Sequence, residues 1–192
     1  ASVNVLDHGF TVGDGVFETL KTVDGVPFAL TRHLHRLNHS ATGLGLPALD
    51  PDAVRAAVAD VLAMRTYPLG VLRITYTSGP GPLGSQRGDQ GTTLAAVSMP
   101  GSPWPPTTRI ATSRWPRNDR SALVGLKTTS YAENAVCLAH AKAAGASEAI
   151  LANLNRYRGM LSGDDIPRTT EIILSFDDDF PEFSKKLTQL SK

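Results

Sequence analysis

The sequence predicts an α+β protein of two lobes. Strand-like runs near residues 16–23 and 72–77 bracket two helical segments, and another strand candidate spans residues 92–98. A proline-rich run follows at residues 100–106, where the missing amide donors favour an extended linker. We therefore expect an N-terminal α+β domain at residues 1–100, a linker at 101–107 and the start of a second domain at 108–153.

The N-terminal domain begins with the glycine-rich segment Asp7–Thr19, which we expect to be a tight loop that enters the first strand. Glycines there allow positive backbone angles and close approach of a ligand, although a purely structural hairpin needs the same residues. The first helix opens at residues 30–37 with Thr31 as its expected cap. Asp50 and Pro51 open the second helix, since proline suits the first helical position.

The strand at residues 71–77 alternates apolar and polar side chains, which places Arg73 on the face opposite Tyr76. The loop at residues 79–88 is rich in glycine and proline and contains Arg87. It lacks the lysine followed by serine or threonine that a phosphate-binding P-loop needs, so nucleotide binding receives little support.

The second lobe contains the run GLKTTSYAEN, at residues 125–134. We expect Ser130 to cap a helix and Glu133 to reach back to the cap amide, which places Lys127 at the positive helix end. A partial positive charge favours loss of the ammonium proton, and a neutral amine forms a Schiff base with an aldehyde. A solvated surface lysine is the alternative. A strand candidate follows at residues 148–152.

Four motifs in this order, VGDGVFET, HLHRL, LRITYTSG and GLKTTSYAEN, resemble the class IV aminotransferase family, which comprises the fold-type IV pyridoxal-phosphate enzymes. That family includes branched-chain and D-amino acid aminotransferases and aminodeoxychorismate lyase. The resemblance runs from Ala1 to about Asn153. It implies the two-lobed fold-type IV fold, with pyridoxal 5'-phosphate as cofactor.

The resemblance also implies residue roles. Lys127 corresponds to the Schiff-base lysine and general base, and Arg36 to the arginine that grips the cofactor phosphate. Tyr131 corresponds to a tyrosine that bonds the cofactor phenolic oxygen in branched-chain members, although its spacing from the lysine differs here. Arg73 is the candidate for the substrate carboxylate, with an internal ion pair as the alternative. Arg87 is a candidate contact for an acidic substrate, with a flexible surface loop as the alternative.

The implied reaction is amino-group transfer between an amino acid and a 2-oxo acid, or lysis of aminodeoxychorismate to 4-aminobenzoate and pyruvate. Both reactions need an electron sink, an exchangeable amine, a phosphate clamp and a proton carrier at the α-carbon. The expected partners are the small-molecule substrate and a second copy of the chain, because full-length relatives are commonly homodimers.

The pattern changes after about residue 153. Alanine is frequent before this point and absent from residues 153–192. The family places a glutamate for the pyridine nitrogen beyond the last strand, whereas this register holds Gly159, and no spacing requires Asp164 or Asp165 to replace it. We expect the second domain to be truncated or divergent here, with residues 154–192 as a divergent tail.

Two alternatives to an active enzyme follow from the residues. Loss of the pyridine-nitrogen carboxylate favours a catalytically inactive remnant that serves as a dimerisation or regulatory domain. A metal-binding module is the second alternative, because His33, His35 and His39 share one helix and folding would bring Asp7 or His8 to them. The HxxxH spacing lacks the intervening catalytic glutamate, so we expect no metal site.

Composition excludes several classes. A net charge of +1 and 41% hydrophobic residues fit a soluble globular protein, and no basic run interleaves with aromatic residues as nucleic-acid binding would need. Cys137 is alone, so it forms no internal disulfide. No apolar run has membrane-spanning length and no signal-peptide pattern opens the chain, so the expected setting is cytoplasmic.

Overall fold

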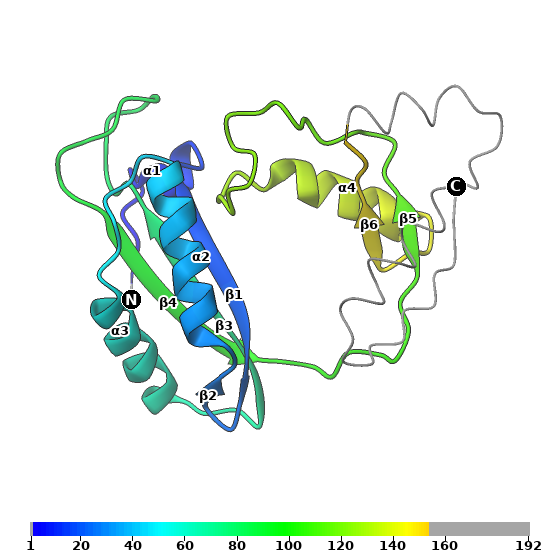
Figure 1. Cartoon of the computed structure of the whole chain (residues 1–192), viewed down its shortest axis with the longest axis horizontal. Coiled ribbons are helices and arrows are strands. Elements are labelled where there is room, and N and C mark those ends of the chain that lie inside the picture. Colours follow the sequence, from blue (N-terminus) through cyan, green and yellow to red (C-terminus); the bar gives the residue numbers. More distant parts are fainter. Residues whose placement is uncertain (1, 154–192) are drawn as a thin grey trace. The chain divides into compact units, whose positions relative to one another are not determined.

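The computed structural model describes residues 2–153, which form two compact units (Figure 1). The first unit contains residues 2–103 and 119–133, and the second contains residues 104–118 and 134–153. The chain first passes between the units at Pro103 and Trp104. The segment 119–133 differs from expectation, because its contacts join it to the N-terminal unit rather than to the second lobe.

An antiparallel sheet of order β2-β1-β3-β4 forms the centre of the first unit. Its strands are β1 (Gly15–Val23), β2 (Val26–Pro27), β3 (Leu69–Thr77) and β4 (Thr93–Pro100). Alternate residues are buried along most of β3 and from Glu18 onward in β1, as period-two patterning dictates for a sheet with one covered face. Residues 15–18 of β1 are all buried, Phe17 included. Tyr76 is buried and Arg73 lies on the opposite, exposed face, which confirms the predicted alternation.

Helices α2 (Leu30–Gly43) and α3 (Pro51–Met64) supply the apolar side chains that bury one face of this sheet, and α2 lies across that face in Figure 1. Asp50 caps α3 by accepting from the Asp52 amide, and Pro51 occupies the first helical position, as predicted. The shared core comprises Val16, Leu20, Leu34, Leu37, Ala41, Leu46, Val54, Val58, Leu62, Leu72, Ile74 and Tyr76.

Two predictions about local secondary structure in the first unit were wrong. The segment ahead of β1 contains a short helix, α1 (His8–Thr11), because the Asp7 side chain accepts from the Gly9 amide and caps it. Helix α2 begins at Leu30 after Ala29, whose φ of 51° is left-handed, and no side chain caps it. Thr31 is therefore inside α2, where its hydroxyl accepts from Arg55.

The second unit contains a β-α-β crossover. Strands β5 (Ile110–Thr112) and β6 (Glu148–Ile150) are parallel, and α4 (Ala132–Ala143) connects them along the chain. Small residues build its core, with Ala111, Ala141 and Ala146 buried and Ala149 packed against them. None of the described helices has the length and apolarity needed to span a lipid bilayer.

Candidate active site

Backbone pairing holds the Lys127 segment against the edge of β1. The Phe17 amide donates to the Lys127 carbonyl at 3.1 Å, and the Thr129 amide donates to the Gly15 carbonyl at 2.8 Å. The Lys127 amide donates to the Ser40 hydroxyl of α2 at 3.1 Å. The segment therefore joins β1 through an isolated antiparallel bridge between Val16 and Thr128, and both β1 and α2 fix the backbone of the lysine.

Residues 129 and 130 anchor this segment to the loop before β1. The hydroxyls of Thr129 and Ser130 donate to the Gly13 carbonyl at 2.9 and 3.0 Å. Gly13 has a φ of 72°, and a Cβ there would lie 2.7 Å from the Ser130 hydroxyl oxygen, so the position suits glycine. The predicted cap was wrong, because Ser130 bonds Gly13 and α4 begins at Ala132. Strand pairing, rather than a capped helix end, positions Lys127.

The side chain of Lys127 is half-buried among aromatic rings. Its Nζ lies 4.3 Å from the Phe17 ring centroid and 5.5 Å from that of Tyr131, and the two rings meet edge to face with centroids 5.1 Å apart. The Arg73 Cζ lies 3.7 Å from the Phe17 centroid. The structure thus brings three predicted site residues together around Phe17, which the sequence analysis did not single out.

The guanidinium of Arg73 is available for an anion on this exposed sheet face. Burial lowers the pKa of this guanidinium below its ordinary value, and the nearby Tyr131 phenol acts in the raising direction. Its hydrogen bond within the protein is weak, with Nε donating to the Thr75 hydroxyl at 3.4 Å. An internal ion pair was the alternative reading, and the described residues place no carboxylate within salt-bridge distance of this arginine.

Arg36 lies on α2 and pairs with a buried carboxylate of β1. Its Nε donates to Glu18 Oε1 and its Nη2 donates to Glu18 Oε2, both at 2.6 Å. The Glu18 side chain is fully buried, whereas 56% of the Arg36 side chain is exposed. One edge of the guanidinium is therefore fixed inside the fold while the rest faces outward.

Helix geometry places Arg36 close to the docking point of the lysine backbone. Arg36 and Ser40 are four residues apart on α2, so their side chains neighbour each other on one helix face. Ser40 accepts from the Lys127 amide. The guanidinium and the lysine backbone are thus held at neighbouring positions of α2.

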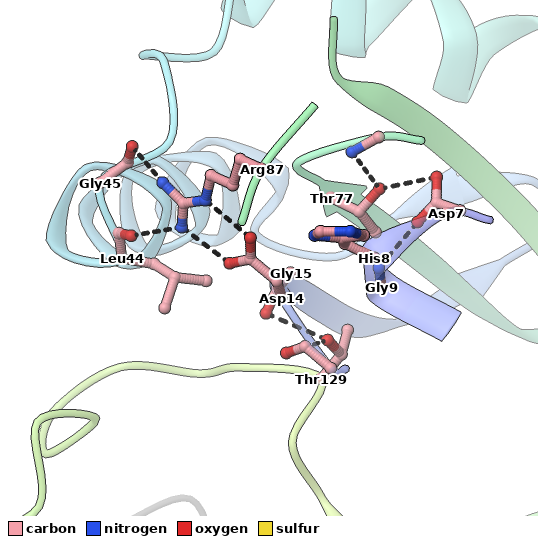
Figure 2. A network of polar contacts seen from close by, with 12 residues as sticks. Asp7, His8, Gly9, Asp14, Gly15, Leu44, Gly45, Thr77, Arg87 and Thr129 are labelled. Atoms are coloured by element: carbon pink, nitrogen blue, oxygen red, sulfur yellow. Dashed lines mark hydrogen bonds and ion pairs between the residues drawn. The ribbon is translucent and has the colours of Figure 1, made fainter. Parts of the chain in front are cut away.

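Arg87 binds within the protein (Figure 2). Its Nε and Nη2 donate to the two carboxylate oxygens of Asp14 at 2.7 Å, and its outer nitrogens donate to the carbonyls of Leu44 and Gly45. These bonds tie the loop at residues 79–91 to the end of α2. They favour a structural role for Arg87 over substrate contact, and we do not assign it to the substrate site.

The same figure shows how the start of the chain is held to β3. Asp7 is buried, and its carboxylate accepts from the Gly9 amide at 2.8 Å and from the Thr77 hydroxyl at 3.0 Å. His8 is also buried, with Nε2 at 2.8 Å from the Pro82 carbonyl. These side chains serve the fold, and their hydrogen bonds are made to residues outside α2, the helix that carries His33, His35 and His39.

Three of the candidate metal ligands, Asp7, His8 and His33, are engaged in other hydrogen bonds. His33 bonds Glu18 through Nδ1 at 2.8 Å. Within residues 2–153, no group of three or more histidine, cysteine, aspartate or glutamate side chains is placed to hold a metal ion.

The predictions about Gly159, Asp164, Asp165 and the divergent tail fall outside the described residues.

Comparisons with known proteins identify the family of this chain. The family model for class IV amino-transferases matches residues 15–158. A bifunctional aminodeoxychorismate lyase / D-amino acid transaminase from Mycobacterium tuberculosis is 34% identical over 175 residues, which cover 84% of this chain and 57% of that protein. This chain thus spans little more than half the length of that relative.

Solved structures of class IV relatives have a similar fold. A fold IV transaminase from Curtobacterium pusillum superposes with a TM-score of 0.71 at 31% identity, covering 81% of this chain and 55% of the other. The PLP-bound form of a hypothetical aminotransferase from Mycobacterium tuberculosis gives a TM-score of 0.67 at 27% identity, covering 81% of this chain and 58% of the other. The described residues thus have the fold-type IV fold that the motifs predicted, and the chain belongs to the class IV aminotransferase family.

Proposed function

We propose that this chain carries the catalytic lysine of a pyridoxal-phosphate enzyme that transfers amino groups between amino acids and 2-oxo acids or cleaves aminodeoxychorismate. One observation carries the proposal: the Lys127 amine rests on Phe17 and Tyr131 while its backbone is fixed to the helix that presents Arg36. The relatives support it, because their names cover both reactions.

The described residues fit two ends of the cofactor. The Lys127 amine has the chemistry to bind an aldehyde carbon, and the outward edge of Arg36 offers N–H donors to a phosphate. Pyridoxal phosphate, when bound, supplies the electron sink for the α-carbon of the substrate. The carboxylate that the family places at the pyridine nitrogen belongs to the part of the chain outside the described residues.

Each remaining residue takes a role that its position allows. The Lys127 amine is the candidate carrier of the α-proton. Arg73, stacked on Phe17 beside it, is the candidate for the substrate carboxylate. The Tyr131 phenol lies on the same ring cluster and is the candidate donor to the phenolic oxygen of the cofactor. We further propose that the active form is a homodimer.

The test is turnover by the purified protein with pyridoxal phosphate. We would supply D- and L-amino acids with 2-oxoglutarate, and aminodeoxychorismate separately, and quantify the 2-oxo acid, 4-aminobenzoate and pyruvate formed. The proposal predicts product in one of these assays and loss of at least about a thousandfold in Lys127→Ala. Lys142→Ala, a lysine of α4, is the matched control. No product in either assay contradicts the proposal and leaves the inactive remnant.

A further inference from the structure

Glu18 places a carboxylate at a buried core position, where an apolar side chain is usual. It lies on β1 between Val16 and Leu20, all three are buried, and its register partner on β3 is Ile74. Burying a carboxylate among apolar side chains is costly unless it is paired and hydrogen-bonded, and a well-packed apolar pair is often as stable. The position therefore calls for a role beyond packing.

Three hydrogen bonds compensate the burial of Glu18. Arg36 donates from Nε and Nη2, one bond to each carboxylate oxygen, and His33 Nδ1 donates to Oε2 at 2.8 Å. His33 and Arg36 are three residues apart on α2, so one helix face supplies all the donors. The carboxylate thus holds the helix and its arginine in one orientation.

The orientation of Arg36 follows from the planarity of the guanidinium. Glu18 engages the edge that carries Nε and Nη2, so the Nη1 hydrogens and the outer Nη2 hydrogen face away from it. Among the described residues, Nη1 has no hydrogen-bond partner, and 56% of the side chain is exposed. A bidentate donor edge is therefore presented outward, in the geometry that phosphate oxygens accept.

Glu18 and Arg36 are both held in their charged forms. Burial acts to raise the pKa of the Glu18 carboxyl, but the hydrogen bonds from Arg36 and then His33 outweigh it, and the pKa lies below its ordinary value. The hydrogen bond to Glu18 raises the pKa of Arg36. Glu18 is therefore ionised at neutral pH and holds a fully charged guanidinium.

We propose that Glu18 and His33 are positioning residues that aim the outer edge of Arg36 at the cofactor phosphate. This inference rests on the proposed function and adds two residues to it. A guanidinium without its carboxylate samples several rotamers and loses that order when it binds an anion. Glu18 bonds His33 and Arg36 rather than Lys127, so we expect the effect of Glu18 and His33 to be confined to the phosphate.

The test compares pyridoxal phosphate with pyridoxal, which has the same aldehyde and no phosphate. We would measure the apparent dissociation constant of each from the fraction of Lys127 trapped by borohydride. The readout is the preference for the phosphorylated aldehyde. We expect this preference to fall about 100-fold in Arg36→Gln, about tenfold in Glu18→Gln and about threefold in His33→Gln, with pyridoxal binding unchanged.

Matched controls lie on the same helix. Arg32→Gln and His35→Gln remove the same side-chain types from exposed positions of α2 and should leave the preference unchanged. Glu18→Gln added to Arg36→Gln should cause no further loss, because the two residues act as a unit. Circular dichroism verifies that each variant is folded, and the half-buried His33 carries the test if Glu18→Gln unfolds.

The outcomes separate the two proposals. An unchanged preference in folded Glu18→Gln and His33→Gln overturns the positioning role while the proposed function stands. An equal loss of pyridoxal and pyridoxal phosphate also overturns it, because that result shows general damage to the site. If the wild-type protein traps neither aldehyde at Lys127, the proposed function itself fails.

Discussion

The bond between Ser40 and Lys127 links the core to the candidate catalytic residue, and Ser40→Ala tests it. Ser40 is fully buried, and its hydroxyl accepts from the Lys127 amide at 3.1 Å. Its removal leaves that amide without its partner, which costs about 1–2 kcal/mol. Alanine returns about 0.5 kcal/mol through its higher helix propensity. The net loss is about 1 kcal/mol, or about 2–4 °C in Tm for a chain of this length.

Thermal unfolding by circular dichroism measures this loss, and Thr42→Ala is the control. Thr42 is an exposed residue of the same helix whose hydroxyl bonds only α2 carbonyls, so its replacement reports the propensity gain alone. We also expect slower borohydride trapping of cofactor on Lys127 in Ser40→Ala, because the lysine backbone is less fixed. A Tm for Ser40→Ala equal to or above that of Thr42→Ala would refute the docking argument.

Three further predictions concern the rest of the first unit. Arg87→Ala should lower the free energy of unfolding by about 1 kcal/mol, a modest value because 37% of this side chain is exposed and screened, and the loss should shrink in 1 M salt. In acid, the lowered pKa of Glu18 gives stability that is complete above pH 4.5 and is lost as the pH falls through the folded value. Glu18→Gln should flatten that part of an acid-unfolding curve; an unaltered curve would exclude this carboxyl as its source. Gly79→Ala should cost about 2 kcal/mol more than Gly91→Ala by urea unfolding, since both have positive φ but only at Gly79 would a Cβ meet a backbone carbonyl, that of Gly91. Equal midpoints for the two variants would contradict the packing of this loop.

Local patterns were sufficient where one physical rule dominates. Alternation of apolar residues placed the strands and put Arg73 opposite Tyr76, because a half-covered sheet buries every second residue. The pairing of Asp50 with Pro51 marked a helix start, because both residues satisfy the free end of a helix. The motif order was sufficient to indicate the family, which the comparisons confirm.

Those local patterns could not predict contacts between residues that lie far apart in the sequence. Ser130 had the signature of a cap, but its hydroxyl bonds Gly13, more than a hundred residues earlier in the chain. Glu18 occupies a core position in the alternation of β1, and an acidic residue there is itself a signal. It could have been matched to His33 and Arg36, which share one face of the next helix.

The measurement that tests the account most directly is the site of cofactor attachment in the wild-type chain. The protein would be incubated with pyridoxal phosphate, scanned for a long-wavelength absorbance band, reduced with borohydride and mapped by peptide mass spectrometry. The account predicts the band and a single reduced pyridoxyl adduct on Lys127. No band, or adducts spread over exposed lysines such as Lys21 and Lys142, would contradict it.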